Sequence, residues 1–146
     1  MKNPAVLGFY GESNTGKTTL IENIIKSLKA EGLKVATVKI TNKKIGMDNV
    51  GKDTWRHSQA GSNLIVLSSL IETDFILKEP RNINKIIQNI NNMGEYDIIL
   101  VEGANDPGIS KIRIGDIPER ENTILTYKND FEEVIRTIKN TILRSK

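Results

Sequence analysis

The sequence of 146 residues predicts an α/β fold with three layers, a mainly parallel central sheet and a single domain over residues 1–146. Two patterns lead to this prediction. Short apolar segments typical of strands alternate along the chain with amphipathic segments typical of helices, which is the order that a parallel sheet with crossover helices requires. One late segment, residues 96–101, is nearly continuously apolar, as expected for a central strand covered on both faces.

The beginning of the chain reads as strand, helix and strand. Residues 5–10 form a short apolar run that ends at a glycine, which indicates a buried first strand. A helix is expected over residues 18–30, and Gly32 stands where a left-handed residue would end it. Residues 34–40 are expected to form the second strand. The apolar positions of the helix share one stripe: Leu20, Ile21, Ile24, Ile25 and Leu28.

The middle of the chain is more polar. Residues 41–52 contain glycine and few apolar side chains, so we expect a mobile loop. Asp53 is expected to be the N-cap of a short helix that stops at Gly61. Residues 64–69 are expected to form a third strand, and residues 75–77 a further short strand.

Two amphipathic helices are expected in the last part of the chain, on either side of the apolar segment 96–101 and a last strand at residues 123–127. The spacing of the apolar positions is three and four residues in both helices. The inward positions of the first helix are Ile83, Ile86, Ile87, Ile90 and Met93, and those of the second are Phe131, Val134, Ile135, Ile138 and Ile142.

Composition excludes several classes of protein. The chain has no cysteine, which excludes disulfides, thiolate zinc sites and iron–sulfur clusters, and its single histidine, His57, excludes a His-rich metal site. A metal is therefore expected to be a hard ion held by oxygens, such as Mg²⁺. Aromatic residues are only 5% and no basic cluster lies among them, so we expect no nucleic-acid binding. No apolar run approaches the length of a membrane span and no signal-peptide pattern is present, so we expect a cytoplasmic protein without membrane contact.

A phosphate-binding loop is the strongest signal in the sequence. Residues 11–18 match the pattern G-x-x-x-x-G-K-S/T in full, between an apolar strand and an amphipathic helix. A coincidental match is a roughly one-in-a-hundred event in a chain of this length. The motif therefore predicts a nucleoside triphosphate site and a P-loop NTPase fold. The residues expected to hold the phosphates are Gly11, Glu12, Ser13, Asn14, Thr15, Gly16, Lys17, Thr18 and Thr19.

The chemistry explains the spacing of this motif. Glycines let the backbone curl so that amide groups point at the phosphates, and the start of the helix adds a favourable potential for an anion. Lys17 is expected to contact the β- and γ-phosphates and to act in catalysis, and the hydroxyl of Thr18 is expected to ligate Mg²⁺.

A second metal ligand is expected at the carboxyl end of a neighbouring strand, where ligands of open α/β sheets gather. Asp97 and Glu102 flank the same strand, about 16 Å apart. Glu102 lies at the carboxyl end, and we expect it to act on Mg²⁺ directly or through a water and to be the second catalytic residue, with Gly103 allowing a sharp turn beside it. The alternative is a carboxylate that caps a loop. We expect Asp97, at the opposite edge, to be a solvated residue.

Two further residues are candidates for the site. Lys39 ends the second strand at the same edge and is expected to contact phosphate or Glu102; the alternative is an ordinary exposed lysine. Asp53 is a candidate for contact with the metal or nucleotide, and plain helix capping is the alternative.

Several segments together resemble the molybdopterin-guanine dinucleotide biosynthesis protein B family, MobB. They are GESNTGKTTL at residues 11–20, Val38-Lys39, GKDTWRHSQAG at residues 51–61 and LVEG at residues 100–103. Ser110-Lys111-Ile112 is similar to a Pro-Lys-Ile or Pro-Lys-Val pattern of that family, with Ser110 in place of proline. The segment GKDTWRH followed by AG is the more specific part, because the phosphate loop is common to many proteins.

The resemblance implies a dimeric GTP-binding protein with slow intrinsic hydrolysis. It further implies that the protein assists the guanylyltransferase that joins GMP to molybdopterin, the organic part of the molybdenum or tungsten cofactor, with molybdopterin itself as a further candidate ligand. Residues 11–19 would hold phosphates, Lys39 and Glu102 would line the site, and residues 51–57 would form a lid. The chain departs from the family at residues 40–44, where relatives often carry several histidines.

The sequence leaves other functions open. A P-loop small-molecule kinase is the main alternative, although the chain lacks the arginine-rich lid of such enzymes. A signalling GTPase would carry Asn-Lys-x-Asp after a late strand, and Asn42-Lys43 is not such a motif. Base recognition is therefore expected from Asn129 or Asp130, after the last strand. Arg56 and Arg113 are candidates for an arginine that acts across a dimer.

Overall fold

The computed structural model describes residues 3–12 and 16–146. The chain divides into two compact units, one made of Met1–Thr41 with Ile83–Lys146 and the other of Asn42–Asn82. The prediction of one domain over residues 1–146 stays a prediction.

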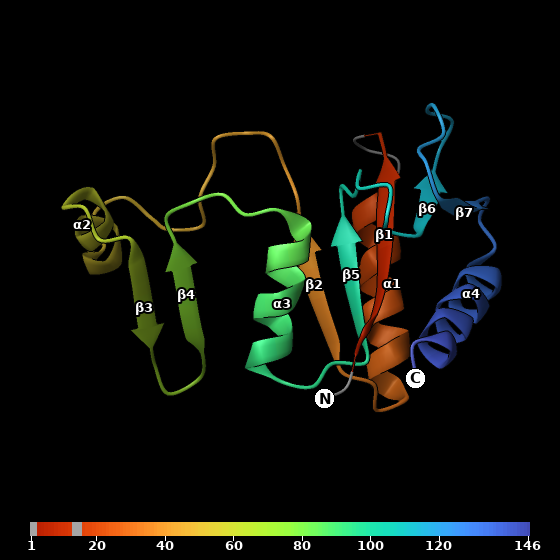
Figure 1. Cartoon of the computed structure of the whole chain (residues 1–146), viewed down its shortest axis with the longest axis horizontal. Helices are drawn as coiled ribbons and strands as arrows, with labels where there is room; N and C mark the ends of the chain where they lie inside the picture. Colours follow the sequence, from red (N-terminus) through yellow and green to blue (C-terminus); the bar gives the residue numbers. More distant parts are fainter. Residues whose placement is uncertain (1–2, 13–15) are drawn as a thin grey trace. The chain divides into compact units, whose positions relative to one another are not determined.

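A five-stranded sheet forms the centre of the first unit, in the order β2-β5-β1-β6-β7. All four neighbouring pairs are parallel, so the predicted mainly parallel sheet is confirmed. Figure 1 shows β2, β5, β1 and β6 side by side, with their arrowheads toward the same edge. The strands are β1 Ala5–Gly11, β2 Val35–Lys39, β5 Ile98–Glu102, β6 Lys111–Ile114 and β7 Thr123–Tyr127.

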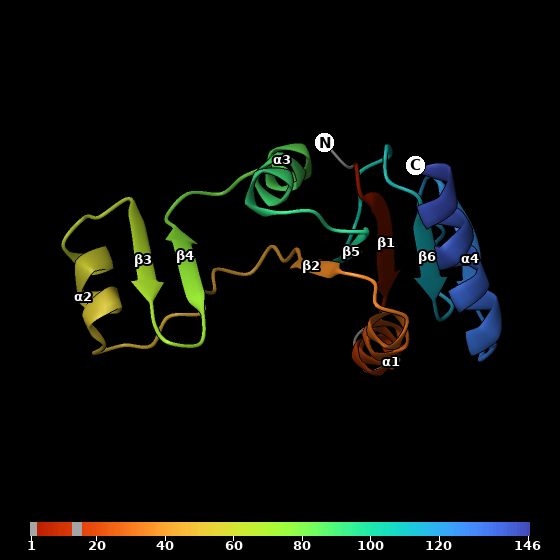
Figure 2. The same ribbon diagram turned by 90° about the horizontal axis from the view of Figure 1, so that it is seen from below.

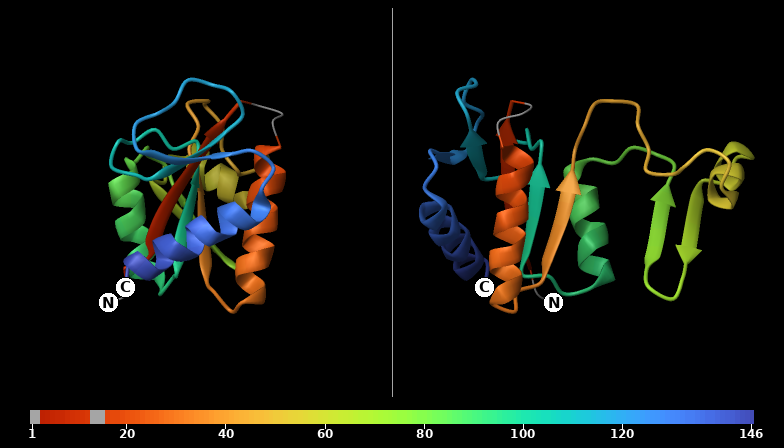
Figure 3. Two further views of the ribbon diagram at one scale, coloured as in Figure 1. Left: turned by 90° about the vertical axis from the view of Figure 1, so that its right-hand side faces the viewer. Right: turned by 180° about the vertical axis from the view of Figure 1, so that it is seen from behind.

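Helices cover both faces of this sheet. Helix α1 (Lys17–Ala30) and helix α4 (Phe131–Arg144) contribute to one apolar cluster with alternate residues of β1, and helix α3 (Ile83–Met93) contributes to a second cluster on the other face. Figures 2 and 3 show α1 and α3 on opposite sides of the strands. The three-layer prediction is confirmed, and Gly32 follows α1 in a left-handed conformation with φ 78°, as expected.

Strand β5 is deeply buried, because it lies between β1 and β2 and is covered on both faces. The side chains of Ile98, Ile99, Leu100 and Val101 are at most 1% exposed. The prediction of a buried central strand is therefore confirmed, although the strand begins at Ile98 instead of residue 96.

Asp97 differs from its prediction. Its side chain is only 8% exposed, and its Oδ2 accepts a hydrogen bond of 2.7 Å from the backbone N–H of Lys34. The carboxylate thus ties the residue before β2 to the residue before β5, at the edge of the sheet opposite to Glu102. The expectation of a solvated residue was wrong because the parallel pairing of β2 with β5 places a backbone donor beside it.

Strand β6 was not predicted: it has only four residues, and two of them are charged, unlike the apolar runs that indicated the other strands of the sheet. The connection from β5 to β6 is also unusual: residues 103–110 pass over β1 without a helix, whereas such parallel crossovers usually need a dozen or more residues. Gly8 of β1 makes this close passage possible, since a Cβ there would lie 2.5 Å from the Cβ of Ala104.

The second unit contains helix α2 (Asp53–Gln59) and an antiparallel pair, β3 (Leu64–Ser68) and β4 (Thr73–Leu77). Both strands were predicted, but they form a separate two-stranded sheet. The N-cap of α2 is Lys52, so the prediction of Asp53 as N-cap was wrong by one residue. Asp53 lies in the first turn, where its negative charge interacts favourably with the helix dipole.

The ends of the remaining elements lie close to their predicted positions. Helix α2 ends at Gln59, and Gly61 follows it in a left-handed conformation with φ 111°. Within residues 3–12 and 16–146, none of the helices combines the length and the apolar character needed to span a membrane.

Candidate functional site

The carboxyl ends of three neighbouring strands bring the predicted residues to one edge of the sheet. In the parallel register, Glu102 of β5 pairs with Phe9 of β1 on one side and with Lys39 of β2 on the other. Gly11, two residues after Phe9, ends β1 at the same edge. The structure therefore brings the start of the phosphate loop, Glu102 and Lys39 together as expected.

Two glycines frame the phosphate loop. Gly11 leaves no room for a side chain, because a Cβ there would lie 2.5 Å from the carbonyl oxygen of Ile114. Gly16 is the N-cap of α1 and has a left-handed conformation, with φ 82° and ψ 12°. The first-turn amide groups of a helix have no intrahelical acceptor, so the start of α1 offers donors and a positive potential to an anion.

The other loop residues are placed as follows. Glu12, Thr18 and Thr19 are exposed at this end of α1. Ser13, Asn14 and Thr15 lie outside the described residues, so their predicted roles stay predictions.

Lys17 lies beside Glu102. The two side chains come within 4.0 Å, from Nζ to Oε1, and each is 20% exposed. The ammonium also donates a hydrogen bond of 3.1 Å to the carbonyl oxygen of Gly11. Lys17 thus connects the start of α1, the end of β1 and the carboxylate at the end of β5, where a phosphate and a cation would meet.

The backbone around Glu102 is fixed on both sides. The carbonyl of Glu102 accepts a hydrogen bond of 2.9 Å from the N–H of Ile40, and the N–H of Gly103 donates one of 2.8 Å to Phe9. Gly103 has φ 85°, and a Cβ there would lie 2.5 Å from the carbonyl oxygen of Ile40. The chain therefore turns directly after Glu102, as the glycine predicted.

The donor atoms at this edge suit a hard cation. The hydroxyl of Thr18 and the carboxylate of Glu102 are oxygen donors, which Mg²⁺ prefers, and phosphates would supply further oxygens. Lys39 is exposed at the neighbouring strand end. Asp53 belongs to the other unit and is also exposed, so its predicted contact with the metal or nucleotide stays a prediction.

A hollow of about 370 Å³ adjoins the phosphate loop. It lies between the start of α1 and the segment after β7, and Asn129 in its wall has φ 66°. The neighbouring Asp130 is the N-cap of α4, since its Oδ1 accepts a hydrogen bond of 3.1 Å from the N–H of Glu133. The lining residues are Gly16, Thr19, Leu20, Asn23, Tyr127, Asn129 and Phe131.

Of the two residues expected to recognise the base, Asn129 thus lines a hollow beside the phosphate loop. Asn23 and Tyr127 were missed by sequence reasoning, because neither belongs to a motif. Only the fold brings α1 beside the end of β7.

Comparison with known proteins extends these observations. The family model described as "Molybdopterin guanine dinucleotide synthesis protein B" matches residues 6–139, nearly the whole chain. The chain belongs to the MobB family. The resemblance seen in the sequence is therefore confirmed.

Curated MobB relatives differ in how much of their length the chain covers. A molybdopterin-guanine dinucleotide biosynthesis adapter protein of Haemophilus influenzae is 29% identical over 142 residues, or 91% of this chain and 79% of the relative. The adapter protein of Escherichia coli is 30% identical over 110 residues, or 73% and 63% of the two chains. A putative adapter protein of Methanocaldococcus jannaschii is 35% identical over 103 residues, or 69% of this chain and 41% of the relative.

Solved MobB structures share the fold along almost the entire chain. A Bacillus subtilis MobB structure superposes with a TM-score of 0.75 at 17% identity, covering 94% of this chain and 97% of that one. A MobB homolog from Bacillus stearothermophilus gives a TM-score of 0.68 at 18% identity, covering 96% and 99%. At these identities the likeness concerns the fold, and it confirms the predicted P-loop architecture.

The two candidate arginines have different surroundings in this MobB chain. Arg113 of β6 is half-buried, and its guanidinium donates hydrogen bonds of 3.1 Å to Thr126 Oγ1 and 3.0 Å to the carbonyl of Ile117. Arg56 is exposed on α2 and lines a hollow of about 320 Å³ with Asp53 and His57. Arg113 therefore supports the segment after β6, and Arg56 is the arginine that faces solvent.

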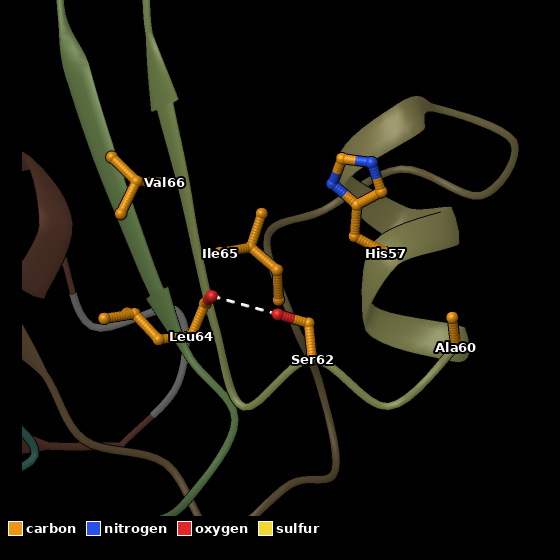
Figure 4. Close-up of a pocket in the computed structure, with 6 residues that line it drawn as sticks. All are labelled: His57, Ala60, Ser62, Leu64, Ile65 and Val66. Carbon is orange, nitrogen blue, oxygen red and sulfur yellow. Dashed lines mark hydrogen bonds between the residues drawn. The ribbon is translucent and has the colours of Figure 1, made fainter.

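A second hollow in the smaller unit has a volume of about 380 Å³ (Figure 4). His57 is exposed on α2 above it, and Ile65 of β3 points toward the helix and is only 4% exposed. Ser62 donates a hydrogen bond of 3.0 Å to the carbonyl of Leu64. The lining residues are His57, Ala60, Ser62, Leu64, Ile65 and Val66.

Proposed function

We propose that this MobB protein binds GTP with Mg²⁺ and acts as an adapter in molybdopterin guanine dinucleotide biosynthesis, serving the guanylyltransferase that joins GMP to molybdopterin. The juxtaposition of Lys17 and Glu102 at the phosphate loop supports this proposal most strongly. Membership of the MobB family supports the pathway. Molybdopterin is a further candidate ligand, and the cytoplasm is the expected location.

The phosphates would lie over the start of α1. The amide groups of the loop and the Lys17 ammonium bind the β- and γ-phosphate oxygens, and charge-assisted hydrogen bonds of this kind are the strong ones. Thr18 and Glu102 hold Mg²⁺, which neutralises phosphate charge when bound. Lys39, paired in register with Glu102, adds positive charge at the same edge.

We expect GTP hydrolysis to be slow, because Arg113 and Arg120 in the first unit are both engaged in contacts with other protein groups. Fast GTPases place an arginine on the phosphates in the transition state. Arg113 is held by Thr126 and Ile117, and the guanidinium of Arg120 stacks on Tyr10, 4.7 Å from the ring centroid. An adapter that holds its nucleotide for a partner enzyme needs no rapid turnover of its own.

Base recognition is proposed for the hollow beside the phosphate loop. Asn23 and Asn129 each offer an amide donor and acceptor, which suits the O6 acceptor and the N1 and N2 donors of guanine. Tyr127 and Phe131 supply ring surface for the plane of the base.

We expect GTP to bind at least about tenfold more tightly than ATP in calorimetric titrations. Equal affinities would contradict guanine recognition.

Lys17→Ala is expected to weaken GTP binding about 10- to 100-fold while the protein stays folded, because one charge-assisted contact is lost. Isothermal titration measures the affinity, and circular dichroism measures the fold. Lys26→Ala, on the same helix and about two and a half turns further along, is the matched control and should bind as the wild type does. Full affinity in Lys17→Ala would refute the phosphate site.

Glu102→Gln is expected to reduce the Mg²⁺-dependent gain in GTP affinity at least about tenfold, because it removes the carboxylate charge from the cation. Asp97→Asn, at the other end of the same strand, is the matched control. It should leave the gain unchanged and lower the free energy of unfolding by about 1 kcal/mol, since it weakens the acceptor of the Lys34 N–H. Equal effects of the two variants on the gain would refute the role of Glu102.

A homodimer is proposed through the two-stranded sheet of the smaller unit. Leu64, Val66 and Phe75 share one face of this sheet, where Val66 pairs with Phe75, and their exposures are 50%, 49% and 56%. An isolated two-stranded sheet is marginally stable in water, and an exposed apolar patch of this kind marks an interaction surface. A second copy of the chain would cover this face.

Phe75→Glu is expected to shift the protein from dimer to monomer, because two carboxylates would be buried near each other in a symmetric interface. Sedimentation velocity at several protein concentrations measures the change. Leu143→Glu is the control, because Leu143 is 66% exposed on α4 in the other unit. A monomeric wild type, or an unchanged dimer in Phe75→Glu, would refute this interface.

A further inference from the structure

The connection between β5 and β6 is short and contains no helix or strand. Residues 104–109, here called the strap, begin two positions after Glu102 and pass over β1. Ala104 is fully buried and Ile109 is 6% exposed. Both side chains lie close to Gly8 of β1, because a Cβ on Gly8 would be 2.5 Å from Ala104 and 3.3 Å from Ile109. The strap therefore lies directly on the sheet, and Figure 1 shows this connection beside the ends of β5 and β1.

Lys111 fastens the far end of the strap. Its side chain is fully buried, and its ammonium donates hydrogen bonds to the carbonyl of Asp106 and, at 2.7 Å each, to those of Ile109 and Glu121. Burial lowers the pKa of Lys111, and the carboxylates of Asp106 and Glu121 oppose this shift. An apolar side chain of equal length would fill the same space but leave three carbonyls without this donor.

Arg120 fastens the near end. Its Nη1 donates a hydrogen bond of 2.7 Å to the carbonyl of Ala104, and its guanidinium stacks on the ring of Tyr10. The backbone N–H of Arg120 donates to the hydroxyl of Tyr10 at 3.0 Å. Tyr10 immediately precedes Gly11, so the same contacts join the strap to the strand that carries the phosphate loop.

We propose that Lys111 and Arg120 are positioning residues: by fastening the strap at both ends, they fix the direction of the chain after Glu102 and hold its carboxylate beside Lys17. Gly103, with no Cβ and φ 85°, is the joint between Glu102 and the strap. Because a glycine restrains the backbone little by itself, the direction in which the chain leaves Glu102 depends on how Ala104 is held. This inference rests on the proposed role of Glu102 in holding Mg²⁺.

The test is the gain in GTP affinity on addition of Mg²⁺, the ratio of the dissociation constants without and with the metal. Lys111→Met is expected to lower this gain about tenfold, as loss of a group that orients a metal ligand does. The affinity without Mg²⁺ should stay unchanged, because the phosphate loop itself is intact. An equal loss of affinity with and without Mg²⁺ would overturn the inference, since it would indicate general loosening of the site.

A double-mutant cycle separates positioning from structural support. If Lys111 acts through Glu102, the Mg²⁺ gain of Glu102→Gln with Lys111→Met equals that of Glu102→Gln alone. Losses that multiply would show independent action and overturn the inference.

Arg120→Met is the second variant and keeps the test decisive if Lys111→Met does not fold, because it removes one hydrogen bond to the strap and the stacking on Tyr10 from a residue that is only half-buried. Its Mg²⁺ gain should also fall. Lys139→Met is the control, since the ion pair of Lys139 with Glu31, 2.6 Å long, joins α4 to the end of α1. It should leave the gain unchanged.

The outcomes distinguish the two proposals. A full Mg²⁺ gain in Glu102→Gln would refute the metal role of Glu102. A reduced gain in Glu102→Gln with full gains in Lys111→Met and Arg120→Met would refute the strap alone.

Discussion

The parallel pairing of β5 with both β1 and β2 is the constraint on which the rest of the molecule depends. It places Glu102 in register with Phe9 and Lys39, although the three residues are far apart in the sequence. The hydrogen bonds of Asp97 to Lys34 at one edge and of Glu102 to Ile40 at the other fix this register along the whole strand. The position of the Glu102 backbone, beside the end of β1 that leads into the phosphate loop, follows from it.

The sequence predicted those parts of the fold that depend on local patterns. The phosphate loop, the amphipathic stripes of α1, α3 and α4 and the buried β5 each have a signal within a short window, and the structure contains the three helices and the strand. The choice of Glu102 over Asp97 for the binding edge needed one geometric argument, that the ligands of a parallel sheet gather at the carboxyl ends of its strands.

Other features had no local signal. Strand β6 was missed because it has only four residues, and the burial of Lys111 depends on carbonyl groups in the segments directly before and after the strand. The environment of Asp97 and the convergence of Asn23 with Asn129 are likewise products of strand order and helix packing. Long-range contacts of this kind leave no periodicity to detect.

The smaller unit is one continuous segment of the chain between β2 and α3, so it interrupts the sequence of the larger unit only once. None of its strands belongs to the parallel sheet. Substitutions, or changes in loop length, in residues 42–82 can accordingly accumulate without disturbing the register that pairs Glu102 with Phe9 and Lys39.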